Sequence, residues 1–255
     1  MARVQCCENP PTLNPSSGNW HVDEIGGLKS YVSGSPDSSL AVILISDVFG
    51  YEAPNLSLLN GLICKLVVYY LKRKLADKVA AAGYYVVVPD YFHGEPYNPE
   101  NSERPLQVWL KDHGPEKGYE ETKPVIESLK QKGISKIGAA GFCWGAKVVV
   151  RLAQGDYIQA GVFLHPSFVT VDDIKGVKVP LAVLGAENDH LSPPTLLTQF
   201  GEALNAKPEV EGFVKIFPGV AHGWAVRYNP EDAAALNSAE EAHLEMLAWF
   251  LKHIK

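Results

Sequence analysis

Short apolar segments alternate along this chain with longer stretches in which apolar residues recur at helical spacing. Residues 40–45, which read LAVILI, form a continuous apolar run typical of a strand buried on both faces of a sheet. Residues 28–32 predict an edge strand before it. Further strands are predicted at residues 84–88, 137–140, 161–164, 181–184 and 213–217.

Helical patterns fill the intervals between these strands. The last has Leu244, Leu247, Phe250 and Leu251 at helical spacing. Because strands and helices alternate repeatedly, the sequence predicts an α/β fold with a mostly parallel sheet covered by helices on both faces. Helices are predicted at residues 76–82, 106–111, 116–131, 146–153, 194–204 and 230–253.

The segment 136–154, reading KIGAAGFCWGAKVVVRLAQ, carries the most specific chemical signal. A strand, a sharp turn and a helix follow one another, with glycines two residues before and two residues after Cys143. This is the nucleophile-elbow pattern with cysteine in place of serine. Such a turn leaves no room for flanking side chains, and its helix N-terminus favours a thiolate and an oxyanion. The alternative is a buried structural cysteine beside a glycine-rich turn.

Two later loops supply an acid and a base. The loop after residues 181–184 contains Glu187 and Asp189, and the loop after residues 213–217 contains His222. The order nucleophile, acid, histidine is that of α/β-hydrolases. We therefore predict that His222 is the base and Asp189 its orienting acid, with Glu187 as the rival. The alternative is that these acids cap the helix that begins near Pro193.

Composition limits the classes of function. The chain has 255 residues, 46% of them hydrophobic, and a formal net charge of −6. These values suit one domain and argue against nucleic acid or an anionic membrane as a partner. We expect a loose arm at residues 1–24, without the apolar core of a signal peptide, and a single domain at residues 25–255.

The cysteines and histidines point to neither disulfides nor metal. The four cysteines, Cys6, Cys7, Cys64 and Cys143, have no disulfide or metal spacing, which favours reduced thiols and a cytoplasmic location. The eight histidines show no metal-ligand spacing either. No metal or organic cofactor is therefore expected.

Taken together, these motifs resemble the dienelactone hydrolase family, which includes the carboxymethylenebutenolidases. The resemblance extends over roughly residues 25–254. It is carried by the segments Asp47-Val48-Phe49-Gly50, Val88-Pro89-Asp90-Tyr91-Phe92, Gly141-Phe142-Cys143-Trp144-Gly145, Ala186-Glu187-Asn188-Asp189 and Ala221-His222-Gly223-Trp224.

The resemblance implies an α/β-hydrolase fold and a catalytic triad of Cys143, Asp189 and His222. It also implies that the backbone N–H groups of Val48 and Trp144 form the oxyanion hole. Asp47 maps to an acid that tunes the nucleophilic thiol in family members, although aspartate is one carbon shorter than the family's glutamate.

The implied activity is hydrolysis of a small ester or lactone through a thioester acyl-enzyme, by a monomer or weak homodimer. Family members that open dienelactones hold the substrate carboxylate with arginines. The loop at residues 90–95 has His93 but no arginine. Arg227 is then the best candidate to bind substrate, with a solvated loop arginine as its alternative.

Two other functions remain as hypotheses. One is a catalytically weak ligand-binding or redox-responsive protein on the same fold, in which Cys143 is an oxidation-sensitive thiol. The other is a glucan endohydrolase, as some plant relatives are labelled. We rank it lower because glycosidases need two opposed carboxyl groups, which a Cys-His-Asp set does not supply.

Residues 57–72, reading SLLNGLICKLVVYYLK, depart from the family pattern, and we interpret them as an insert. The segment is too short, and too interrupted by Asn60 and Lys65, to span a membrane. We expect its apolar residues to be a liability for solubility or for access to the site.

Overall fold

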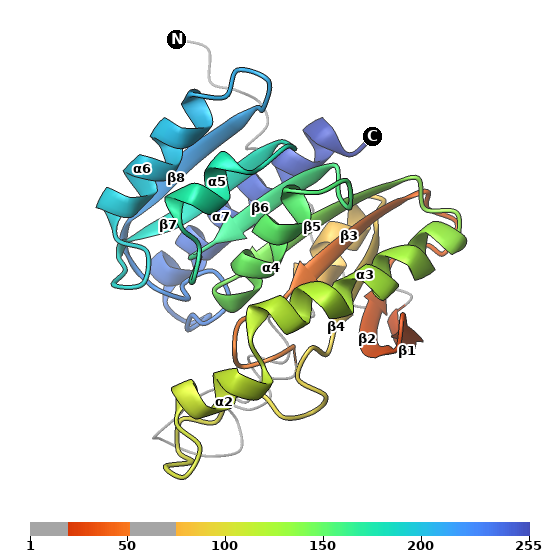
Figure 1. Cartoon of the computed structure of the whole chain (residues 1–255), viewed down its shortest axis with the longest axis horizontal. Helices are drawn as coiled ribbons and strands as arrows, with labels where there is room; N and C mark the ends of the chain where they lie inside the picture. Colours follow the sequence, from red (N-terminus) through yellow and green to blue (C-terminus); the bar gives the residue numbers. More distant parts are fainter. Residues whose placement is uncertain (1–19, 52–74) are drawn as a thin grey trace.

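In the part of the chain that the structure describes, eight strands form one twisted sheet at the centre of the molecule (Figure 1). The computed structural model describes residues 20–51 and 75–255. The strand order is β1-β2-β4-β3-β5-β6-β7-β8, with β1, β2 and β4 antiparallel and all other neighbours parallel. The strands are β1 (Trp20–Ile25), β2 (Leu28–Ser33), β3 (Leu40–Ile45), β4 (Tyr85–Pro89), β5 (Lys136–Phe142), β6 (Ala160–Leu164), β7 (Leu181–Asn188) and β8 (Gly212–Ala221).

Helices cover both faces of the sheet, as predicted. Residues 75–81 are helical and pack with α7 on one face, while α3 to α6 lie on the other (Figure 1). The named helices are α2 (Leu106–Asp112), α3 (Pro115–Gln131), α4 (Trp144–Ala153), α5 (Val171–Lys175), α6 (Pro194–Asn205) and α7 (Ala233–His253).

The central strand β3 shows why its sequence is apolar throughout. Ile43 and Ile45 belong to the core on the side of α4, whereas Val42 and Leu44 belong to the core on the side of α7. Successive side chains of a strand point to opposite faces, so a strand covered on both faces needs apolar residues at every position.

The structure corrects the predicted boundary of the N-terminal arm. Residues 20–24 belong to β1, which forms an antiparallel hairpin with β2. The turn consists of Gly26 and Gly27, with φ of +60° and +85°, a conformation that glycine adopts without strain. Most of β1 is exposed, so it lacks the apolar alternation that reveals a strand. The remainder of the arm and the insert at residues 57–72 lie outside the described residues.

At their carboxyl-terminal ends, β7 and β8 extend further than predicted. β7 continues to Asn188 and β8 to Ala221, so Glu187 and residues 218–221 lie in strands and not in loops. A register shift between Ala186 and Asn188 accommodates the extension. The pairing of these polar and glycine-containing segments depends on the neighbouring strand, which a local pattern does not reveal.

Candidate active site

The turn between β5 and α4 has the geometry of a nucleophile elbow. Cys143 adopts φ 52° and ψ −109°, an unusual backbone conformation for a residue other than glycine. A Cβ atom on Gly141 would lie 2.4 Å from the carbonyl oxygen of Gly145, and one on Gly145 would lie 2.2 Å from that of Ile45. Both approaches are far inside van der Waals contact, which explains the glycine spacing around the cysteine.

Asp189 and His222 are in direct contact at the ends of β7 and β8. His222 Nδ1 lies 2.7 Å from Asp189 Oδ2, and the Asp189 side chain is fully buried. The backbone N–H groups of Leu191 and Ser192 donate to Asp189 Oδ1 at 2.8 and 3.2 Å. Burial opposes ionisation of this carboxyl, but the hydrogen bond with His222 and the two backbone donors outweigh it and lower the pKa of Asp189.

Glu187, the rival acid, has a different partner. Its Oε2 atom accepts a hydrogen bond from the backbone N–H of Gly219 at 2.7 Å, which links β7 to β8. Asp189 is thus the acid that the structure brings to His222.

The environment of His222 favours its protonated form. Burial alone would lower the pKa of His222, but the hydrogen bond with Asp189 and the side chain of Cys143 raise it to about 9. Nε2 is buried and makes no direct hydrogen bond to a described residue. With a pKa of about 9, the imidazole of His222 is protonated at neutral pH.

The two predicted oxyanion donors are the backbone N–H groups of Val48 and Trp144. Neither Val48 N nor Trp144 N donates to any acceptor among the described residues. The position of Val48 is fixed through its carbonyl, which accepts from Tyr97 N at 2.9 Å. Trp144 is fixed through its indole Nε1, which donates to the carbonyl of His113 at 2.9 Å. Both N–H groups thus lack an acceptor within the described residues, and their role as an oxyanion hole stays a prediction.

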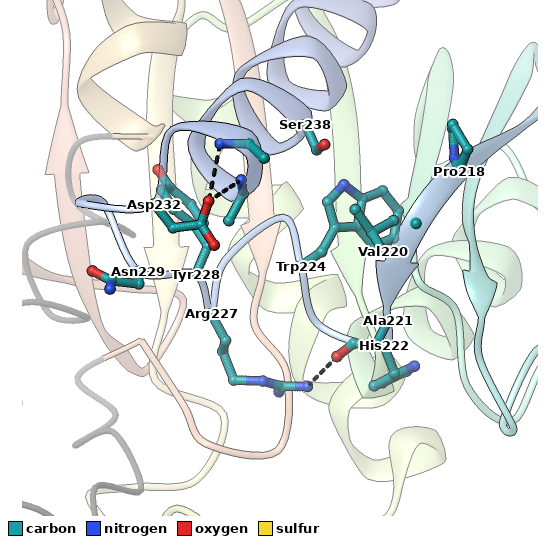
Figure 2. A pocket seen from close by; sticks show the side chains of 13 residues that line it. Pro218, Val220, Ala221, His222, Trp224, Arg227, Tyr228, Asn229, Asp232 and Ser238 are labelled. Atoms are coloured by element: carbon teal, nitrogen blue, oxygen red, sulfur yellow. Dashed lines mark hydrogen bonds between the residues drawn. The ribbon is translucent and has the colours of Figure 1, made fainter.

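Asp47 and Arg227 pair with one another across the site. Arg227 Nη1 donates to Asp47 Oδ2 at 2.6 Å, and the Asp47 side chain is fully buried. The guanidinium lies 5.0 Å from the centre of the Phe49 ring, and its Nη2 reaches the carbonyl of His222 at 3.5 Å (Figure 2). The pair therefore ties the Val48 loop to the loop that carries His222.

His93 has a partner away from this cluster. Its Nε2 lies 3.1 Å from Glu121 Oε1 on α3, and its side chain is half exposed. Of the two candidate substrate-binding residues, Arg227 thus lies beside the catalytic candidates, whereas the observed contact of His93 is with α3.

The loop after β6 is part of the site and was not identified from the sequence. Ser167 Oγ lies 3.3 Å from Cys143 Sγ, and the ring of His165 stands 4.9 Å from that of His222. His165 and Phe168 both have positive φ, 41° and 62°. Residues held in such conformations cluster at functional sites. Residues 165–168, which read HPSF, match no sequence motif. The position of this loop beside Cys143 is therefore visible only in the folded structure.

A cavity of about 460 Å³ lies beside His222, between the end of β8 and the start of α7 (Figure 2). Arg227, Tyr228 and Asp232 are among its lining residues.

Within residues 20–51 and 75–255, no group of three or more histidine, cysteine, aspartate or glutamate side chains is arranged to bind a metal ion. The helices in these ranges include none with the length and apolar character needed to cross a bilayer.

The sheet, its helices and the elbow form an α/β-hydrolase fold, and a dienelactone hydrolase from Anabaena variabilis shares the architecture. Its structure aligns with a TM-score of 0.64 at 15% identity, covering 93% of this chain and 99% of that one. The sequence profile of the dienelactone hydrolase family matches residues 28–254. The chain therefore belongs to the dienelactone hydrolase family and is a hydrolase, as the sequence motifs predicted.

Two named relatives differ in what they are said to do. The carboxymethylenebutenolidase homolog of Homo sapiens is 31% identical over 237 residues, covering 91% of this chain and 90% of its own length. The endo-1,3;1,4-beta-D-glucanase of Zea mays is 39% identical over 215 residues, covering 82% of this chain and 64% of its own length. The chain thus spans less than two thirds of the maize relative.

Proposed function

We propose that this protein hydrolyses small esters or lactones with Cys143 as nucleophile, His222 as acid and base, and Asp189 as the orienting acid. The observation that carries the proposal is the buried contact of Asp189 with His222, whose pKa also responds to the elbow cysteine. A buried structural cysteine would need neither a strained turn nor a cationic imidazole beside it.

The reaction follows from these positions. The Cys143 thiolate attacks the carbonyl carbon, and the carbonyl oxygen becomes an oxyanion held by the N–H groups of Val48 and Trp144. The imidazolium of His222 donates its Nε2 proton to the departing alcohol oxygen as the thioester forms. Neutral His222 then takes a proton from water, which attacks the thioester and releases the acid and the thiolate. Asp189 holds the imidazole with Nδ1 protonated throughout.

Asp47 and Arg227 are assigned supporting roles. Asp47 influences the thiol through its own ion pair with Arg227, and Arg227 retains donors for a substrate that carries an acidic group. His93 would meet only a substrate long enough to extend towards α3. A monomer or weak homodimer suffices for this chemistry, and a reducing compartment such as the cytoplasm would keep the thiol reduced.

The maize relative raises glucan hydrolysis as a second candidate. A glycosidase of the usual kind needs one carboxyl group that stays protonated to act as an acid. In this site Asp189 is hydrogen-bonded to His222, and the pKa of Asp189 is lowered. Asp47 forms an ion pair with Arg227. The carboxyl groups are thus engaged as ionised partners, which favours acyl transfer over glycosyl transfer.

Substrate class is tested by assaying the protein on p-nitrophenyl acetate, a small aryl lactone and a mixed-linkage β-glucan at neutral pH. We expect turnover of the ester and lactone and no release of reducing sugar. Heat-denatured protein controls for spontaneous hydrolysis of the activated ester. Release of oligosaccharides without ester cleavage would contradict the proposed function.

A further inference from the structure

The loop after β6 places a buried hydroxyl group against the sulfur of Cys143. Ser167 Oγ is 3.3 Å from Sγ, within hydrogen-bond range for sulfur, and Ser167 is only 2% exposed. Neither the motifs nor the triad includes this residue. We propose that Ser167 is a further catalytic residue, whose hydroxyl donates a hydrogen bond to the Cys143 thiolate and holds the sulfur in position for attack.

The direction of the hydrogen bond follows from the partners available. Among the described residues, the sulfur is the only hydrogen-bond partner of the Ser167 hydroxyl. A buried hydroxyl donates where an acceptor exists, because an unused donor is costly. A thiolate is an acceptor only, so the hydroxyl must donate once Cys143 is ionised. Hydrogen bonds to charged groups are also the stronger kind.

The backbone holds this hydroxyl in place. Ser167 N donates to the carbonyl oxygen of Cys143 at 3.0 Å, so the serine contacts both the main chain and the sulfur of the elbow. Ser192 Oγ donates to the carbonyl of Pro166 at 2.5 Å, and Ser192 N donates to Asp189. Hydrogen bonds thus connect His222, Asp189, the Ser192 loop and the Ser167 loop to the nucleophile.

Strain in the loop supports a functional role. Positive φ values at His165 and Phe168 flank Pro166 and Ser167 on both sides. Neither residue is glycine, and a bulky residue in this region of φ is uncommon. Backbone strain of this kind persists where the surroundings fix a functional geometry. Here the fixed geometry is the placement of the Ser167 hydroxyl.

Other charged and titratable groups belong to the same site. His222, paired with Asp189 at the ends of β7 and β8, interacts with the charge of the sulfur. The Asp47–Arg227 pair joins the loop after β3 to the loop that carries His222. His165 lies on the loop after β6, and α4 presents its N-terminus. His222 is the main source of positive charge, so Ser167 adds a neutral hydrogen bond to a site already arranged for a thiolate.

The test is the pH profile of Cys143 alkylation by iodoacetamide in wild type and Ser167→Ala. Modification is followed on the tryptic peptide of residues 137–147, in which Cys143 is the only cysteine. Loss of the hydrogen bond should lower the fraction of thiolate about tenfold below the titration midpoint. A more basic thiolate is also more nucleophilic. The variant should therefore react about threefold more slowly below the titration midpoint and about threefold faster above it.

Matched variants separate this role from packing. Ser30→Ala removes another fully buried serine hydroxyl, on β2, and should leave the alkylation profile unchanged. Ser167→Thr keeps the hydroxyl and should keep the wild-type midpoint. If Ser167→Ala has a markedly lower Tm than wild type, Ser167→Val is compared with Ser167→Thr instead. These two side chains have the same shape and differ in the presence of the hydroxyl group.

The proposed role of Ser167 rests on Cys143 being the nucleophile. Different results would contradict the role of Ser167 and the role of Cys143. Coincident profiles for wild type and Ser167→Ala would overturn the role of Ser167, even if Cys143→Ala is inactive. A uniform slowing at every pH would indicate altered access and would equally overturn it. Full ester turnover by Cys143→Ala would instead remove the proposed function itself.

Discussion

Replacing Cys143 by alanine should lower ester turnover by at least about 10⁴-fold, because loss of the nucleophile removes the covalent pathway. The oxyanion donors of Val48 and Trp144 would remain and sustain only a small residual rate. The fold should persist, since the glycines that permit the elbow are unchanged. Turnover is measured with p-nitrophenyl acetate, and thermal melting checks the fold.

Cys143→Ser is the matched control for shape. A serine hydroxyl, unlike a thiolate, keeps its proton at neutral pH and depends on a base to remove that proton during attack. The serine variant should therefore also be severely impaired. Alanine and serine variants that both retain a tenth or more of wild-type turnover would mean that the ester is cleaved elsewhere.

His222→Ala should lower turnover by about 10⁴ to 10⁶-fold, the effect typical of removing a triad member. Without the imidazolium the thiol loses its counter-ion, and without the neutral imidazole water is not activated for deacylation. The loss should be in kcat, because His222 acts on the reacting atoms. A variant that loses affinity but keeps kcat would assign His222 to substrate binding.

The same histidine should make stability depend on pH. The pKa of His222 is raised from 6.5 to about 9, so its contribution is fully present below 6.5 and is lost as the pH rises through about 9. His222→Gln keeps a hydrogen-bonding side chain but does not titrate. The Tm advantage of wild type over His222→Gln should therefore shrink between pH 6 and pH 9.5. A constant or growing advantage would contradict the raised pKa.

The sequence predicted the centre of the fold well. Strands such as β3 are buried on both faces, so their apolar character does not depend on distant residues. The exposed β1 was missed because its stability comes from pairing with β2 and from the turn at Gly26 and Gly27. The ends of β7 and β8 were also underestimated, because polar residues there continue the strands through pairing with a neighbour.

Some residues of the candidate site could likewise be predicted from local sequence, whereas others could not. Cys143 lies in a motif whose glycines are required by steric contact, so its turn could be predicted from five residues. Asp189 and His222 could be predicted from their order along the chain. The pairing of Asp47 with Arg227 joins residues 180 positions apart, and Ser167 belongs to no motif. Contacts of that kind arise only when the strands assemble.

Trapping the acyl-enzyme tests the central claim most directly. Wild-type protein is mixed with excess p-nitrophenyl acetate, quenched in acid within one turnover, and digested under acidic conditions that preserve a thioester. We expect an added acetyl group on Cys143 that is removed by hydroxylamine and is absent from Cys143→Ala. Turnover with no acetylated Cys143, or with the acetyl group on another residue, would contradict it.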